Sequence, residues 1–312
     1  MFEFLFSESF LASSVSYALP IVFAAYGALI SNKAGIVNIN IEGAMSVSAV
    51  TGALVSFFTG SWVLGLLSAI GAGVAMSLLL SFAAIRLKTD SFLSGIALNT
   101  LATGLGVLIL YVVLGVKGDS SAAPSVMIPT VRIPFLSDIP VIGRALFSQN
   151  LLFYVAVVAL VILMFVLNRT RLGLHIRAVG CNAEASGSVG ISVPAAKRTA
   201  LILCGALCGL GGAYLSMASL GYFSAGMVSG RGFIGIAAEA MGASNPYLTT
   251  LFAFLFGMVD YFAVGAQTVL SIPYELLNTL PYLMTIFALV LYSLATRRAA
   301  QARASRREGN EH

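Results

Sequence analysis

Long stretches without a charged residue alternate with short polar segments along the whole chain. A helix that crosses about 30 Å of hydrocarbon needs about 20 predominantly apolar residues. Several stretches have room for one such crossing, and the longest has room for two. The charge-free stretches cover residues 10–30, 43–85, 91–116, 145–168, 199–230, 240–259 and 276–296. The pattern predicts an all-α, polytopic membrane protein that forms one domain over residues 1–312, with about 8–10 transmembrane helices including short and broken segments.

Composition supports this class and excludes a soluble fold. The chain is 59% hydrophobic and 9% charged, whereas soluble domains carry about 25% charged residues. The net charge of +5 does not indicate a nucleic-acid partner, because the basic residues lie at the ends of the apolar stretches and in the tail. Cys181, Cys204 and Cys208 do not predict a disulfide framework. Cys204 and Cys208 share a helix face, but without a nearby His or carboxylate they make a poor metal site, and small core residues at a helix contact are the better interpretation.

The positions of Lys and Arg predict the orientation, because cytoplasmic loops are enriched in both residues. With the amino terminus outside, 13 of the 17 basic residues lie inside, mainly in the loop 169–198 and the basic tail 297–312. The others, which would lie outside, are Lys117, Arg132, Arg144 and Arg231. The loop 117–150 is then extracytoplasmic, and its four prolines predict an irregular, ordered cover rather than a helix.

This orientation requires an odd number of crossings, so residues 232–296 must supply three of them. Residues 233–241 are too short to cross alone as a helix, and a turn at Ser244-Asn245-Pro246 follows. We expect a short or broken segment there, followed by spans over 248–267 and 282–296. Because broken helices are tolerated at membrane depth only beside protein or a water-filled cavity, this region is a candidate lining of a pathway.

Two segments of the chain resemble each other. Residues 35–45 read Gly-Ile-Val-Asn-Ile-Asn-Ile-Glu-Gly-Ala-Met, and residues 232–241 read Gly-Phe-Ile-Gly-Ile-Ala-Ala-Glu-Ala-Met. In the predicted topology the first segment starts from inside and the second from outside. This arrangement predicts an inverted repeat of the kind that builds a central site in many transporters. Chance similarity between short apolar strings is the alternative.

Ionisable groups inside a membrane are costly, so each needs a partner or a function. Glu42, Glu239 and Asp260 are the acidic residues embedded in apolar sequence. Glu42 and Glu239 either face a central cavity or accept hydrogen bonds from backbone and Asn side chains that lock a helix bend. Asp260 is expected close to the outer interface, in contact with water.

Side-chain amides suit a neutral polar cargo, because each offers both donors and an acceptor. Asn38, Asn40, Asn99 and Gln267 lie in or beside the predicted spans. Together with Glu42 and Glu239 they are the candidate pathway residues. Hydrogen bonds between helices are the alternative role for each amide.

The cytoplasmic loop 169–198 contains a candidate docking element. Asn182 followed by Ala-Glu-Ala predicts a capped helix start, with Glu184 near the positive end of the helix dipole. Gly187 and Gly190 would end this helix after about two turns. The candidate coupling residues are Asn182, Ala183, Glu184, Ala185, Ser186 and Gly187. The helix either docks on a partner or forms an ordinary solvated connector.

The sequence contains no motif for catalysis. It lacks the Gly-x-x-x-x-Gly-Lys-Ser/Thr phosphate loop, His-Glu-x-x-His and Gly-x-Ser-x-Gly. The two histidines, His175 and His312, both lie in predicted cytoplasmic segments. We therefore expect a transport protein without enzymatic activity, a metal site or a cofactor of its own.

A set of motifs in chain order resembles one family. Residues 33–43, Lys-Ala-Gly-Ile-Val-Asn-Ile-Asn-Ile-Glu-Gly, resemble the Gly-x-Val-Asn-Ile-Gly-x-Glu-Gly motif of ABC-transporter permeases for nucleosides and simple sugars, within the branched-chain amino acid permease superfamily. Further similar stretches are residues 90–99, 133–143, 170–180, 205–216, 230–234 and 281–282. The sequence departs from the family at Asn40, where Gly is common, and at Cys181, where a polar residue usually precedes Asn.

The resemblance implies a permease subunit of an ABC importer in the bacterial inner membrane. Such importers contain two ATPase subunits that bind ATP and Mg²⁺, a second permease chain that is identical or a sister, and an external lipoprotein that delivers the substrate. Residues 178–190 would correspond to the cytoplasmic loop that contacts the ATPase. The implied cargo is a nucleoside, and we expect a purine nucleoside.

Two alternatives remain open from the sequence. The same scaffold could carry a sugar or a riboflavin-like vitamin, since related binding proteins accept heterocycles joined to polyols. The chain could instead be an ion-coupled secondary transporter in which Glu42 and Glu239 carry protons. An intramembrane enzyme has no supporting set of residues.

Overall fold

The computed structural model describes residues 8–132 and 147–269, with the single positions 283 and 290. Three predictions therefore fall wholly or partly outside the described residues. These are the last predicted span, the basic tail 297–312 and the middle of the loop 117–150. The side chain of Gln267 also lies outside them, although its backbone belongs to a described helix.

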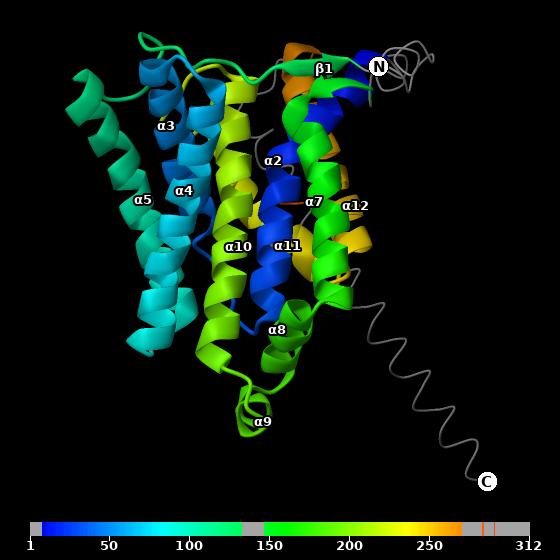
Figure 1. Cartoon of the computed structure of the whole chain (residues 1–312). Helices are drawn as coiled ribbons and strands as arrows, with labels where there is room; N and C mark the ends of the chain where they lie inside the picture. Colours follow the sequence, from blue (N-terminus) through cyan, green and yellow to red (C-terminus); the bar gives the residue numbers. More distant parts are fainter. Residues whose placement is uncertain (1–7, 133–146, 270–282, 284–289, 291–312) are drawn as a thin grey trace.

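Seven helices in the described part are long and apolar enough to cross a membrane (Figure 1). They are α2 (Glu8–Lys33), α3 (Ile41–Thr59), α4 (Trp62–Ser81) with the π-helical turn η1 (Phe82–Arg86), α5 (Ser91–Leu114), α7 (Leu151–Arg169), α10 (Val193–Tyr214) with the π-helical turn η2 (Leu215–Ser219), and α12 (Pro246–Val269). The short α11 (Arg231–Met241) supplies the broken segment predicted before the turn at residues 244–246. The prediction of an all-α, polytopic membrane protein is confirmed.

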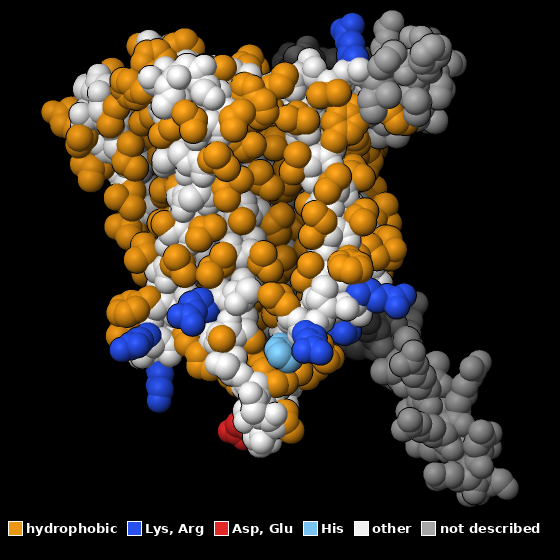
Figure 2. Space-filling model, in the orientation of Figure 1, with side chains coloured by type: hydrophobic (Ala, Val, Ile, Leu, Met, Phe, Trp, Pro, Cys, Tyr) orange, Lys and Arg blue, Asp and Glu red, His pale blue; other side chains and the backbone are white. Residues whose placement is uncertain are grey.

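Small elements cover the two ends of the helical body. At one end, near the start of α2, β1 (Thr130–Arg132) pairs antiparallel with β2 (Ser148–Asn150) (Figure 1). The sequence predicted an irregular cover here and missed this strand pair. At the opposite end, α8 (Arg171–Cys181) leads into α9 (Ala183–Ser188), which protrudes from the body. Apolar side chains cover the flank between the ends, while Lys and Arg gather near α8 and α9 (Figure 2).

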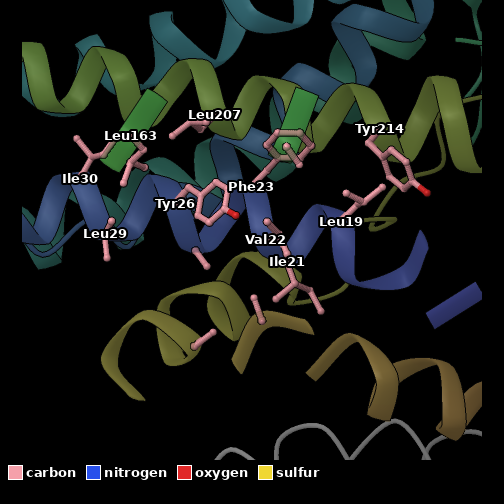
Figure 3. Packing of buried hydrophobic residues seen from close by; sticks show 14 of the residues in the cluster. Leu19, Ile21, Val22, Phe23, Tyr26, Leu29, Ile30, Leu163, Leu207 and Tyr214 are labelled. Carbon is pink, nitrogen blue, oxygen red and sulfur yellow. The ribbon is translucent and has the colours of Figure 1, made fainter. Parts of the chain in front are cut away.

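The core is built around α2, which is apolar along most of its length. Of its most apolar window 83% is buried, against 17% for α5 at the edge of the bundle. Figure 3 shows Phe23 and Tyr26 of α2 in one buried cluster with Leu207 and Tyr214 of α10. A helix that is apolar all round is expected in the interior, whereas a helix at the edge meets lipid or a partner. This difference predicts that α5 is the helix most available to a second molecule.

Glycines allow α4 and α10 to approach backbone to backbone. A Cβ atom added to Gly205 of α10 would lie 2.5 Å from the carbonyl oxygen of Gly73 on α4, and one added to Gly73 would lie 2.9 Å from the nitrogen of Gly209. In lipid the hydrophobic effect does not drive helices together. Membrane helices therefore associate through close packing of small residues of this kind. The contact fixes α10 against the first half of the bundle.

We expect Gly73→Ala to lower the melting temperature of the purified protein in detergent, because the new methyl group overlaps the backbone of Gly205. The expected loss is about 1–3 kcal/mol. Gly71→Ala is the matched control, since it lies on the same helix with nothing within 4 Å of its added Cβ. Equal melting temperatures for the two variants would contradict this packing.

Candidate functional site

The chain between α2 and α3 leaves the helical conformation before α3 begins at Ile41. Gly35 has φ +71°, and amide side chains then hold the segment. Asn38 Oδ1 accepts a hydrogen bond of 2.9 Å from the Asn40 backbone, and Asn40 Nδ2 donates one of 3.2 Å to the carbonyl of Met76. Both amides are buried, and Asn40 is 0% exposed. Their role in this structure is to fix the start of α3, while contact with cargo stays a prediction.

Asn99 of α5 fixes the same junction from the other side. Its Nδ2 donates to the carbonyl of Ile39 at 2.8 Å, and its Oδ1 accepts from the backbone N–H of Gly43 at 2.8 Å. A side-chain amide thus satisfies one acceptor and one donor at a helix start, where the backbone lacks partners of its own. The position of α5 is therefore linked to the conformation of residues 39–43.

Glu42 joins the start of α3 to the start of α11. Its two carboxylate oxygens accept hydrogen bonds of 2.8 Å from the backbone N–H groups of Gly230 and Gly232. Gly230 has φ +80° and provides no side-chain cap for α11, so Glu42 supplies the missing acceptors. The first amides of a helix also form its positive end, which favours a carboxylate there. In this structure Glu42 is therefore a carboxylate that locks a helix start and borders a pocket.

Arg231 and Asp260 form an ion pair that the sequence analysis missed. The guanidinium donates from Nη2 at 2.9 Å and from Nε at 3.1 Å to Asp260 Oδ2, and its Nη1 donates to the carbonyl of Met227. The two side chains are each 16% exposed, and Asp260 lies well inside the spanning helix α12. Both side chains are thus partly buried in the ion pair, while the positions of Arg231 outside and of Asp260 close to the outer interface stay predictions. The signal for this pair was the presence of one basic and one acidic residue in otherwise charge-free sequence, from which the ion pair could have been predicted.

Glu239 locks the other end of α11. Its carboxylate accepts hydrogen bonds from Asn32 Nδ2 at 3.0 Å and from Ser244 Oγ at 2.7 Å, and it is 3% exposed. These bonds tie the end of α2 to the turn that joins α11 and α12. These contacts are those of a structural carboxylate. A role of Glu239 in a translocation pathway stays a prediction.

The two halves of the predicted repeat differ in local structure. Residues 35–40 are not helical and precede α3, whereas residues 232–241 lie within α11. The two segments contact each other through Glu42 and the start of α11. An inverted repeat stays a prediction, and the two glutamates do not occupy equivalent positions.

A pocket of about 490 Å³ lies beside Glu42, between α3, α5 and the segment before α11. Its lining consists of Glu42, Gly43, Ser46, Asn99, Thr100, Thr103, Gly104, Val107, Phe223, Ala225, Gly226, Val228 and Phe233. Glu42 is the one charged residue in this lining, and both of its oxygens already accept backbone hydrogen bonds. The surface thus presents hydroxyls and the ring of Phe233 without a free charge, which suits a neutral polar solute.

Of the predicted pathway residues, Glu42 and Asn99 line this pocket together. A different hollow of about 290 Å³ beside α7 and α10 is lined by apolar side chains throughout, so it offers a polar solute no hydrogen bonds. The pocket beside Glu42 is therefore the better candidate for a translocation site.

The predicted short helix in the loop 169–198 is present as α9. Asn182 caps it by accepting a 3.0 Å hydrogen bond from the Ala185 backbone, and Gly190 with φ +87° follows its end. Glu184 is exposed, and Val189 beside it is 75% exposed. The preceding helix α8 was not predicted, although Gly173, Ile176 and Val179 recur at helical spacing and form its buried face.

The last turn of α8 touches the turn that leads into α3. A Cβ atom on Gly180 would overlap the carbonyl oxygen of Lys33, and one on Gly35 would lie 3.2 Å from Gly180 Cα. Only glycine at position 180 permits this approach. The start of α9 is therefore in backbone contact, through Gly180, with the segment that ends at Glu42.

Comparison with solved structures supports the fold. An ABC transporter assigned to the metal-chelate type, in an inward-facing conformation, aligns with a TM-score of 0.52 at 17% identity, covering 90% of this chain and 85% of that one. PsaBC from Streptococcus pneumoniae in complex with Fab aligns with a TM-score of 0.52 at 12% identity, covering 92% and 93%. At these identities the similarity concerns the fold alone.

Comparison with known sequences is more specific. The nucleoside ABC transporter permease protein NupC of Lactococcus lactis subsp. cremoris is 35% identical, with 90% of this chain and 91% of that protein aligned. The guanosine ABC transporter permease protein NupQ of Bacillus subtilis is 34% identical, with 89% of each chain aligned. TsgC13 of Haloferax volcanii, a permease assigned to glucose ABC transport, is 32% identical, with 84% and 79% aligned.

The family described as branched-chain amino acid transport system / permease component matches residues 10–289, which is most of the chain. The ordered motifs, the polytopic helical fold and these relatives agree with one another. The chain therefore belongs to this family of ABC-transporter permeases.

Proposed function

We propose that this chain is the membrane subunit of an ABC importer that carries nucleosides, purine nucleosides in particular. The observation that carries the proposal is the pocket beside Glu42, which has hydroxyl and aromatic lining and whose one carboxylate is already hydrogen-bonded. A nucleoside is uncharged, stacks its base on aromatic rings and bonds through its sugar hydroxyls. Nucleoside permeases at 34–35% identity support the same cargo.

The same pocket keeps a sugar or a riboflavin-like vitamin as the second candidate cargo. Both are rich in hydroxyls, and a relative assigned to glucose transport is 32% identical. The ring of Phe233, which is 43% exposed, favours a solute with a heterocycle over a simple sugar, because flat rings stack on aromatic side chains.

An ion-coupled mechanism fits the contacts of the two glutamates less well. Glu42 accepts two backbone hydrogen bonds, and Glu239 accepts bonds from Asn32 and Ser244. A proton on either carboxylate would remove acceptors that these donors need, with a penalty for each buried donor left unpaired. Transport then needs an energy source other than an ion gradient. We propose that this source is ATP hydrolysis, with bound Mg²⁺, on partner subunits.

The partners follow from the predicted orientation, with the amino terminus outside and the carboxyl terminus cytoplasmic in a bacterial inner membrane. The protruding α9 would then meet the ATPase subunits in the cytoplasm, presenting Glu184 and Val189. An external binding lipoprotein would deliver the substrate at the end that carries β1 and β2. A second permease chain, identical or a sister, would face α5, whose Leu93 and Val112 are 68% and 73% exposed.

A short route through the backbone could link the ATPase to the pocket. A displacement of α9 would act on α8, and Gly180 of α8 touches the backbone at Lys33 and Gly35. From there residues 36–41 lead directly to Glu42, which holds the start of α11. We infer that movement of α9 changes the pocket by shifting this segment.

Replacing the exposed residues of α9 tests the ATPase contact. We expect the tagged wild-type chain, purified gently, to recover an ATPase that contains a phosphate loop, as identified by mass spectrometry. Glu184→Lys combined with Val189→Asp should lower that recovery by about tenfold, because a few residues of an interface typically contribute most of its binding energy. Ala122→Lys combined with Met127→Asp, exposed at the opposite end, is the control. Full recovery with the α9 variant would contradict the assignment of α9 as the docking element.

Gly180→Ala tests the route from α9 to the pocket. The methyl group would push α8 away from Lys33, so we expect ATP-driven uptake to fall about tenfold while the ATPase still copurifies. Gly71→Ala is the control, because it lies on α4, away from the route between α9 and Glu42, with nothing within 4 Å of its added Cβ, and it should retain uptake. Normal uptake by Gly180→Ala, in protein of unchanged melting temperature, would rule out this contact as the coupling route.

Substitutions at Glu42 test its role as a helix lock. Glu42→Gln keeps one acceptor of two, so we expect a loss of about 1.5–3 kcal/mol in stability, and a larger loss for Glu42→Ala. Ser46→Ala alters the same pocket and spares the bonds to Gly230 and Gly232, so its melting temperature should match wild type. Thermal unfolding of the three variants in detergent is the measurement. A Glu42→Gln protein as stable as wild type would show that the carboxylate is not a structural clamp.

A further inference from the structure

A second polar pocket, of about 590 Å³, lies at the end of the bundle that carries α8 and α9. It is formed where the end of α4 and the turn η1 meet the start of α10. Its lining residues are Leu78, Ser81, Phe82, Ile85, Arg86, Pro194 and Arg198. Basic side chains gather at this end of the molecule, whereas apolar side chains cover the flank above it (Figure 2).

The two arginines make this pocket cationic. Arg86 ends η1, Arg198 lies in the second turn of α10, and both are exposed. No acidic residue lines the pocket, and among residues 8–132 and 147–269 neither guanidinium has an ion pair or hydrogen bond. Guanidinium groups from two helices that converge on one hollow match a phosphate group, which Arg binds through paired hydrogen bonds.

The rest of the wall is apolar and extends along α4. Leu78 is 40% exposed and Phe82 is 55% exposed, and both line the hollow. Leu78 precedes Arg86 by eight residues, which corresponds to about 12 Å along a helix. The pocket therefore runs from a cationic mouth at the polar end of a spanning helix to an apolar wall about two turns further along that helix.

We propose that this pocket binds an anionic phospholipid, with its phosphodiester at Arg86 and Arg198 and an acyl chain against Phe82 and Leu78. Basic pockets between helices on the cytoplasmic side of a membrane suit acidic headgroups. A soluble phosphate has no use for the apolar wall, and a cytoplasmic protein does not reach two turns into the hydrocarbon. The bound lipid holds the end of α4 against the start of α10. This site does not depend on which cargo the transporter carries.

Native mass spectrometry of the purified full-length chain tests the site. After incubation with palmitoyl-oleoyl-phosphatidylglycerol and delipidating washes, the wild type should retain one lipid per chain, and retention of phosphatidylcholine should be lower. Arg86→Gln with Arg198→Gln should reduce retention of phosphatidylglycerol by about tenfold. Arg169→Gln with Arg171→Gln removes two exposed basic side chains at the same end and should leave retention unchanged.

Further measurements distinguish a bound lipid from a soluble anion or a protein in this pocket. Phe82→Ser should also lower retention of phosphatidylglycerol, because it removes apolar wall without changing charge. Glycerol 3-phosphate should not displace the lipid, and displacement would show that the pocket binds a soluble anion instead. Equal losses in the two arginine double variants would overturn the site as a specific one. Loss of the lipid when the chain assembles with its copurifying partners would show that a protein occupies the pocket.

Discussion

The structure depends on one contact between segments that are far apart in the sequence, the hydrogen bonds from Gly230 and Gly232 to the carboxylate of Glu42. Two helices, α3 and α11, begin inside the bundle rather than at its ends, so their first N–H groups lack helical partners. Water cannot satisfy such groups in hydrocarbon, and unsatisfied ones cost several kcal/mol each. The carboxylate meets this need for α11, and Asn99 meets it for α3.

The same arrangement explains why the neighbouring pocket suits a neutral solute. Its one charged residue has its oxygens committed to the backbone, and the cation of Arg231 is committed to Asp260. The polar groups that remain are hydroxyls, beside the exposed ring of Phe233. A site of this kind holds an uncharged polar molecule without the desolvation penalty that a fixed charge would impose.

The sequence predicted features that depend on local pattern. The apolar stretches placed the spanning helices, Asn182 placed the start of α9, and Glu42 with Asn99 marked the pocket. It failed where the structure depends on distant partners. Arg231 and Asp260 pair although they are 29 residues apart in the sequence, and β1 pairs with β2 across a long loop. The predicted repeat aligned two glutamates by spacing, yet Glu42 lies in the first turn of α3 and Glu239 near the end of α11, because equal spacing does not give two segments the same helix boundaries.

The most direct test of the central claim is uptake of radiolabelled guanosine by proteoliposomes that contain the chain with its copurified partners. The account predicts that ATP with Mg²⁺ supports uptake and that a proton gradient imposed without ATP does not, because Glu42 is committed to holding α11. Uptake driven by the proton gradient in the absence of ATP would contradict the account. It would make Glu42 and Glu239 ion-carrying groups in place of helix locks.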